Sequence, residues 1–98
     1  MLYSGHFDEQ RLEQELICQV MRLDIAEELD RLETHLTEIQ RVLLEKGANG
    51  RRLDFLVQEC HRETNTIGSK TDSAQISQIA IDMKVLIEQM REQIQNVE

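Results

Sequence analysis

The chain has 98 residues, of which 40% are hydrophobic and 31% are charged, a balance that is typical of a small globular domain and excludes a disordered chain. Nineteen acidic and eleven basic side chains give a net charge of −8, which opposes long-range attraction to nucleic acid and to anionic membranes but permits a local basic patch. No apolar run approaches the roughly 20 residues of a membrane-spanning helix, and no secretory signal pattern is recognisable. Because Cys18 and Cys60 form no CxxC pair, we expect free thiols in a reducing cytoplasm.

The first predicted helix covers about residues 8–46, and no segment of the chain alternates with the period of two expected of a strand. Apolar side chains recur along it at spacings of three and four: Leu12, Leu16, Val20, Leu23, Leu29, Leu32, Leu36, Ile39 and Leu43. The sequence DIAE at 24–27 matches a capping box, which allows a break or kink near residues 23–25.

Two further helices are predicted over about residues 51–67 and 72–97, because KGANG at 46–50 forms a turn and Gly68 ends the second helix. The second helix carries one apolar side, made of Leu53, Leu56, Val57, Cys60, Thr64 and Ile67. The third carries another, made of Ile76, Ile79, Met83, Leu86, Met90, Ile94 and Val97. Short connections and one stripe per helix predict a single all-α domain over residues 1–98. Its architecture is an elongated antiparallel helical bundle, or a helical hairpin with the third helix packed on it.

The first helix has a second apolar surface, which lies roughly opposite Leu16 and Val20. It comprises Ile17, Cys18, Met21 and Ile25. Either the third helix covers this surface, or it contacts another subunit or another domain. In the second case the chain should self-associate through these four residues.

Polar side chains form two columns that flank the apolar side of the second helix. One column contains Asp54, Gln58, His61 and Asn65, and the other contains Arg52, Glu59 and Glu63. A carboxylate, an imidazole and an amide on one face can hold a divalent cation or place a general base beside a phosphodiester. Two glutamates at positions i and i+4 can also share a metal, although such columns arise by chance as well. His6 and His35 have no comparable setting and are predicted to be surface residues.

Basic side chains gather on and around the same helix, where residues 46–70 hold five basic and three acidic residues. The basic residues are Lys46, Arg51, Arg52, Arg62 and Lys70. They can meet phosphate groups, or they can form ion pairs with glutamates of the same solvated helix. Charge alone leaves both interpretations open.

The segment GRRLDFLVQECHRETNTIGSK at 50–70 resembles the signature of the YicC/YloC family of bacterial proteins. In that family a glycine and two basic residues precede LDFL-x-QE-x-x-RE-x-NT, which is followed by a leucine or isoleucine, any residue, and SK. Matches at 11–15, 24–36 and 88–98 extend the resemblance over nearly the whole chain. Cys60 and His61 depart from the methionine and asparagine that are more frequent there. Family members are usually much longer, so we expect this chain to be equivalent to their C-terminal domain.

The resemblance implies an oligomeric, stress-associated endoribonuclease that depends on a divalent cation, manganese or magnesium, and acts on RNA. By side-chain chemistry, we assign RNA contacts to Arg51, Arg52, Arg62, Lys70, Gln58 and Asn65. Metal binding or acid–base catalysis is assigned to Asp54, Glu59 and Glu63, and His61 is a further catalytic candidate. The competing interpretation is a non-catalytic helical oligomerisation or protein-interaction module, in which the acidic residues only stabilise the fold. No membrane partner and no specificity for DNA are expected.

Overall fold

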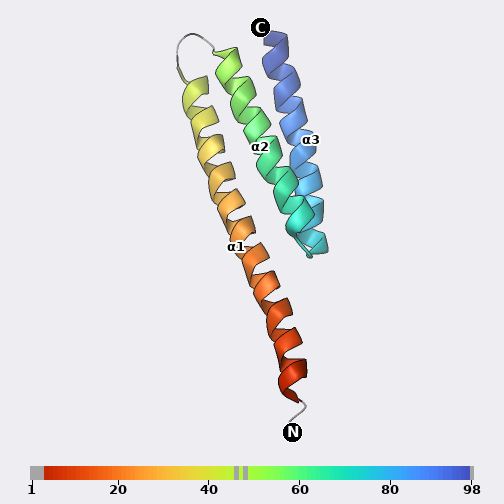
Figure 1. Cartoon of the computed structure of the whole chain (residues 1–98). Helices are drawn as coiled ribbons and strands as arrows, with labels where there is room; N and C mark the ends of the chain where they lie inside the picture. The colour runs from red at the N-terminus through yellow and green to blue at the C-terminus, as the bar shows by residue number, and fades with distance from the viewer. Residues whose placement is uncertain (1–3, 46, 48, 98) are drawn as a thin grey trace.

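The structure, a computed structural model, describes residues 4–45, 47 and 49–97. It contains three helices, α1 (Ser4–Leu43), α2 (Gly50–Lys70) and α3 (Ala74–Val97), as Figure 1 shows. No strand occurs within the described ranges, so the all-α prediction is confirmed. The molecule measures 70 × 21 × 16 Å, which confirms the predicted elongation. None of these helices combines the length and the hydropathy needed to cross a bilayer.

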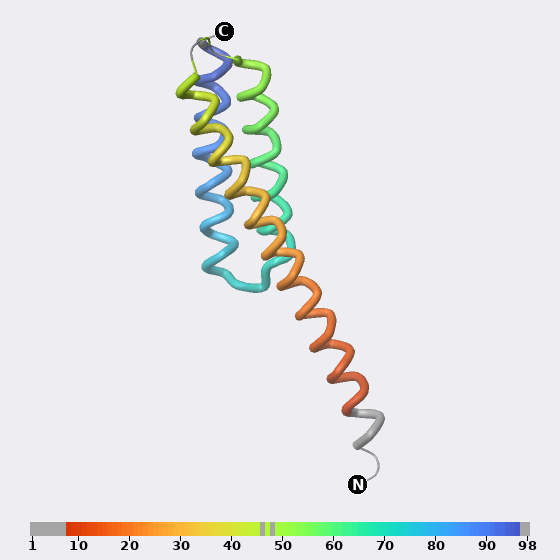
Figure 2. Tube along the Cα trace, turned by 90° about the vertical axis from the view of Figure 1, so that its left-hand side faces the viewer, coloured from red at the N-terminus to blue at the C-terminus, as the bar shows by residue number. Residues whose placement is uncertain are grey.

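The central element is α2, which packs against α1 on one side and against α3 on the other. Neighbouring helices run in opposite directions, and the N-terminal half of α1 projects beyond the turn between α2 and α3 (Figures 1 and 2). Every side chain from residue 8 to residue 23 is exposed. We call residues 8–23 the arm. The fold is therefore an antiparallel three-helix arrangement in which about half of the longest helix lies outside the packed body.

The hydrophobic core is built around the apolar side of α2. Its buried members are Leu32, Ile39 and Val42 of α1, Leu53, Leu56, Val57, Cys60 and Ile67 of α2, and Ile87 of α3. Thr64 is also buried, and its hydroxyl donates a hydrogen bond to the Cys60 carbonyl at 2.8 Å. Burial raises the pKa of the Cys60 thiol to about 11, with a smaller contribution from the nearby carboxylates of Glu63 and Glu59. The predicted apolar side of α2 is thus confirmed.

Only the C-terminal end of α2 differs clearly from the prediction. At the start, the Asn49 side chain accepts a hydrogen bond from the backbone N–H of Arg52 at 3.1 Å, which caps the helix. At the other end, the prediction that Gly68 stops the helix is wrong, because α2 continues to Lys70. A Cβ atom on Gly68 would lie 3.3 Å from the Cβ of Ala80, so the glycine allows α3 to approach closely.

The first helix differs more from its prediction. It runs without interruption through residues 23–25, and the Asp24 carboxylate accepts a hydrogen bond from Lys70 Nζ at 3.2 Å instead of capping a new helix. The predicted stripe is wrong for the arm, where Leu12, Leu16, Val20 and Leu23 are all exposed. Of its members beyond the arm, Leu32 and Ile39 are buried as predicted, whereas the other three are exposed: Leu29, Leu36 and Leu43.

The opposite surface of α1 is the one that continues into the core. Counting back from Leu32 by three or four residues leads to Glu28, Ile25, Met21 and Ile17. Ile25 packs against the core of its own chain, which corrects its assignment to a subunit contact. Ile17, Cys18 and Met21 remain exposed.

A few predicted features cannot be placed. Lys46 lies outside the described residues, and the described parts of His6 and Val97 do not include their side chains.

Candidate functional site

The two polar columns of α2 lie along different helix–helix seams. The column of Arg52, Glu59 and Glu63 faces α1, where Arg52 pairs with Glu38 and Glu63 pairs with His35. The column of Asp54, Gln58 and His61 faces α3, where Asp54 pairs with Arg91. The buried side of α2 separates them, because each residue advances the helix by about 100°. We call these the α1–α2 seam and the α2–α3 seam.

A cluster of three metal-ligating side chains lies in the α1–α2 seam. His35 Nε2 is 3.3 Å from Glu63 Oε2. Together with Glu59, these residues offer one ligand atom each, and the three atoms all lie within 4.8 Å of one another. Glu63 is only 2% exposed, whereas His35 and Glu59 are partly accessible. One cation could therefore be coordinated by all three side chains, with Glu63 on its buried side and His35 and Glu59 on its solvent side.

His35 was predicted to be a surface residue, and that prediction is wrong. Its side chain is 22% exposed and turns toward α2 at the edge of the core. The sequence contains a signal for this position, because His35 lies three residues after Leu32 and four before Ile39, both of which are buried. Spacing alone thus places His35 beside the core stripe.

Two members of the cluster, Glu59 and Glu63, line a cleft of about 480 Å³. The cleft is lined by Glu28, Arg31, Glu59, Arg62, Glu63 and Thr66. Glu28 is 9% exposed and is held by an ion pair with Arg31. Arg62 Nη1 lies 3.7 Å from Glu59 Oε1 and its side chain is 76% exposed. Carboxylates therefore occupy the interior of the cleft, and arginines lie near its edge.

The predicted phosphate-binding residues fall into two groups. Arg52 Nη2 donates to Glu38 Oε2, and Lys70 Nζ donates to Asp24, so both cations are already paired with acidic residues of α1. Hydrogen bonds from Arg41 and Arg52 lower the pKa of Glu38 from 4.5 to about 2. Arg51 and Arg62 lie on the outer side of α2, where both are exposed and Arg62 is paired with Glu59 of its own helix instead of an acidic residue of α1.

Asp54 does not join Glu59 and Glu63. Gln58 Nε2 donates to Asp54 Oδ2 at 2.9 Å, and Arg91 Nε lies 3.6 Å from Asp54 Oδ1. The predicted trio of metal-binding carboxylates is therefore split between the two seams, and His35 takes the third place beside Glu59 and Glu63. His61 lies in a pocket of the α2–α3 seam, and Asn65 is exposed.

Comparison with known proteins agrees with the resemblance in the signature segment. The family model described as "Endoribonuclease YicC-like, C-terminal" matches residues 1–98. The chain belongs to this family. It is 55% identical over 93 residues to the protein named "Probable endoribonuclease YicC" from Haemophilus influenzae, covering 95% of this chain and 32% of that protein. It is 41% identical over 91 residues to the protein of the same name from Clostridioides difficile, covering 93% of this chain and 31% of that protein. The YicC-like chain thus spans about a third of the length of both relatives.

Proposed function

We propose that this YicC-like domain takes part in metal-dependent cleavage of RNA in the cytoplasm, within an oligomer of a longer protein. The observation that carries the proposal is the cluster of His35, Glu59 and Glu63 in the α1–α2 seam. RNA as the substrate is supported by the names of the two curated relatives. The two free cysteines are in keeping with a reducing compartment.

The donor set of the cluster fits a divalent cation. Two carboxylates and one imidazole provide the oxygen and nitrogen ligands that manganese and magnesium accept in proteins. Glu59 and Glu63 stand one helical turn apart, so their charges repel each other across a short distance. Glu63 is buried, and an ionised carboxylate in that position needs a positive partner. A cation beside His35 would meet both requirements.

Three further side chains of the cleft, Glu28, Arg31 and Arg62, can be given a role at a phosphodiester. A bound divalent cation would supply Lewis-acid stabilisation of developing negative charge and would activate a water molecule. Arg62 at the edge of the cleft is placed to bind phosphate oxygens, and the exposed Arg51, about three turns away along α2, would bind a phosphate elsewhere on the strand. Glu28 lies outside the cation cluster and is oriented by Arg31, so we assign it to proton transfer.

The proposed activity can be tested in a hybrid in which this domain replaces the matching segment of the Haemophilus influenzae relative. Single-stranded RNA labelled at one end should be cleaved in the presence of Mn²⁺ or Mg²⁺ and remain intact with EDTA. Glu59→Gln and Glu63→Gln should each reduce kcat by at least about 100-fold, because the cluster loses a charged ligand. Undiminished cleavage with EDTA, or full activity in both variants, would show that the chemistry resides elsewhere.

A second candidate function, assembly of subunits, is favoured by the arm. Leu12, Leu16, Ile17 and Val20 are each more than half exposed, on two sides of a helix that no other element covers. Such a surface is typical of a site of helix–helix association. Self-association through Ile17, Cys18 and Met21 remains our prediction for this surface.

Replacing Ile17 and Met21 together with glutamate should reduce the particle mass in light scattering, because two charges would enter the apolar contact. Helix content should not change, since both side chains lie outside the packed body. Exchanging Glu13 and Gln10 of the same arm for alanine provides a control that keeps the apolar surface. A wild-type domain that remains monomeric at millimolar concentration would contradict the prediction.

A further inference from the structure

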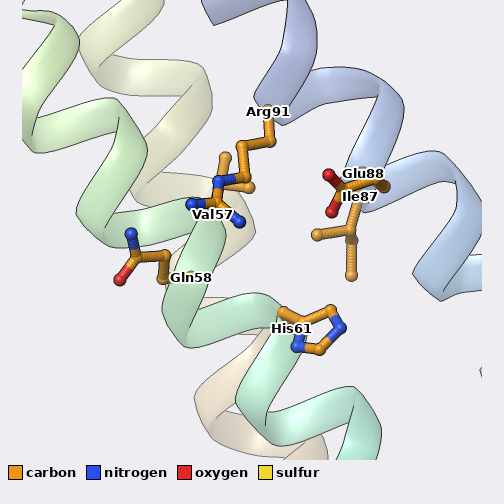
Figure 3. A pocket seen from close by; sticks show the side chains of 6 residues that line it. All are labelled: Val57, Gln58, His61, Ile87, Glu88 and Arg91. Atoms are coloured by element: carbon orange, nitrogen blue, oxygen red, sulfur yellow. The ribbon is translucent and has the colours of Figure 1, made fainter. Parts of the chain in front are cut away.

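A second pocket opens at the α2–α3 seam, on the other side of α2 from the His35 cluster. Figure 3 shows Val57 and His61 of α2 opposite Ile87, Glu88 and Arg91 of α3 across this seam, and Gln58 of α2 at its margin. The pocket has a volume of about 260 Å³. Val57 and Ile87 are buried and form its apolar floor, whereas Gln58, His61 and Glu88 are exposed at its rim. An apolar floor with a few polar groups around it is the usual form of a small-molecule subsite.

The polar groups at the rim retain hydrogen-bonding capacity. Arg91 Nε is 3.6 Å from Asp54 Oδ1, too far for a hydrogen bond, and neither of these buried atoms has a hydrogen-bond partner. Gln58 donates its Nε2 to Asp54, which leaves its Oε1 as an acceptor. Within the described part of the chain, the side chains of His61 and Glu88 take part in no hydrogen bond or ion pair. The Arg91 side chain as a whole is 41% exposed, so a ligand here would find its terminal guanidinium nitrogens, rather than the buried Nε, as a cationic donor beside several acceptors.

We propose that this pocket binds one unpaired nucleobase of an RNA strand. The flat, apolar faces of a base match the floor of Val57 and Ile87, and an imidazole ring such as that of His61 can stack on a base. Gln58 Oε1 and the Glu88 carboxylate can accept hydrogen bonds from amino or ring N–H groups at a base edge. The Arg91 guanidinium can donate to a carbonyl or ring nitrogen of the same edge. This proposal rests on the proposed function, because it assigns a specificity subsite to the same RNA substrate.

Charge favours a base over a phosphate group as the occupant. Asp54 already neutralises Arg91, and Glu88 adds a second carboxylate to the rim, so the pocket has no surplus of positive charge. A phosphate group would be repelled by these carboxylates and would gain nothing from an apolar floor. A nucleobase carries no formal charge, so it can pack on the apolar floor and donate hydrogen bonds to the carboxylates.

The two seams are close enough to serve one strand. They lie on opposite flanks of α2, and an α-helix with its side chains is about 10–12 Å across. Arg62 is exposed on the outer side of α2, between Glu59 of one flank and Asn65 of the other. A strand that crosses α2 over Arg62 would place a base at the α2–α3 seam and a phosphodiester near the His35 cluster. The pocket would then select which linkage is cleaved.

The test uses this domain without metal and eight-nucleotide RNAs of A, C or U, each carrying a fluorophore, together with an abasic ribose–phosphate strand of equal length. Fluorescence anisotropy should give dissociation constants that differ at least fivefold between the best and the worst base, with the abasic strand weakest. Gln58→Ala and Glu88→Gln should each change the ratio between bases at least threefold. Glu92→Gln, one turn further along α3, removes the same charge and should leave the ratio unchanged.

Circular dichroism of each variant checks that the fold is retained. Equal dissociation constants for all bases and for the abasic strand would contradict the proposed base-binding pocket. Ratios of dissociation constants that stay unchanged in both Gln58→Ala and Glu88→Gln would contradict it as well. Absence of binding to every strand would overturn it too. If the hybrid protein nevertheless cleaves RNA with Mn²⁺, only the pocket is wrong. Loss of metal-dependent cleavage, with base-dependent binding retained, would instead refute the proposed function alone.

Discussion

Mn²⁺ should raise the free energy of unfolding of this domain, and Glu63→Gln should abolish that increase. A ligand that binds only the folded state at 100 times its dissociation constant adds about 2.7 kcal/mol to the free energy of unfolding. In a domain of this size that corresponds to a rise in Tm of roughly 10–20 °C. The variant loses the buried carboxylate of the His35 cluster, so its Tm should no longer depend on Mn²⁺. Thermal unfolding followed by circular dichroism measures both.

Asp54→Asn is the matched control, because it makes the corresponding acid-to-amide change on the same helix but in the other seam. It should keep the full response to Mn²⁺, whereas His35→Gln should lose most of it. Without metal, Glu63→Gln should change Tm by only a few degrees, because glutamine keeps the size of the side chain and the partly exposed His35 is not left as an unpaired buried charge. A large loss of Tm without metal would identify Glu63 as a structural residue. If only Asp54→Asn abolished the rise in Tm with Mn²⁺, the cation would bind in the α2–α3 seam, which would contradict the proposal.

Leu56→Ala should lower the free energy of unfolding by about 2–5 kcal/mol. Leu56 is 3% exposed at the centre of the core, and truncating such a residue removes buried methyl groups and leaves a cavity. Because small domains have a total stability of about 5–15 kcal/mol, this single change should shift the urea midpoint strongly. Urea denaturation followed by the helical signal measures the difference.

The adjacent Phe55 provides the control for that experiment. Phe55 is a larger apolar residue, but 57% of it is exposed on the outer side of α2. Phe55→Ala should therefore cost less than about 1 kcal/mol despite the greater volume removed. The reverse order of effects would mean that α2 presents its other side to the core.

The structure of α2 follows from the sequence alone because its apolar residues occupy one side and its turn residues mark its start. The same reasoning failed in the arm, where Leu12 and Leu16 compete with Ile17 and Met21 for the core side. Periodicity identifies apolar surfaces but not which of them is covered, and among the residues that the structure describes nothing covers the arm. The end of α2 was misplaced because Gly68 serves a close approach to Ala80, a reason that a local pattern does not contain.

The candidate site, too, could be predicted from the sequence only in part. Glu59 and Glu63 could be paired from sequence, because residues at i and i+4 always share a helix face. His35 could not be added to them, since its place beside Glu63 depends on how far α1 is shifted along α2. Asp54 was grouped with the glutamates on chemical type, although its position in the other column already separated it from them. Spacing within one helix is local information, whereas the register between two helices is not.

The continuity of α1 couples the arm mechanically to the cleft. The arm is about 24 Å long at 1.5 Å per residue, and no break separates it from Glu28 and His35 further along the same helix. A helix without a hinge behaves as a stiff rod, so a partner that tilted the arm would also displace Glu28 of the cleft and His35 of the cluster. Because Glu59 and Glu63 belong to α2, the same tilt changes the spacing between His35 and the glutamates. Under the proposed function, whatever holds the arm in place would therefore also set how tightly His35, Glu59 and Glu63 could close around a cation.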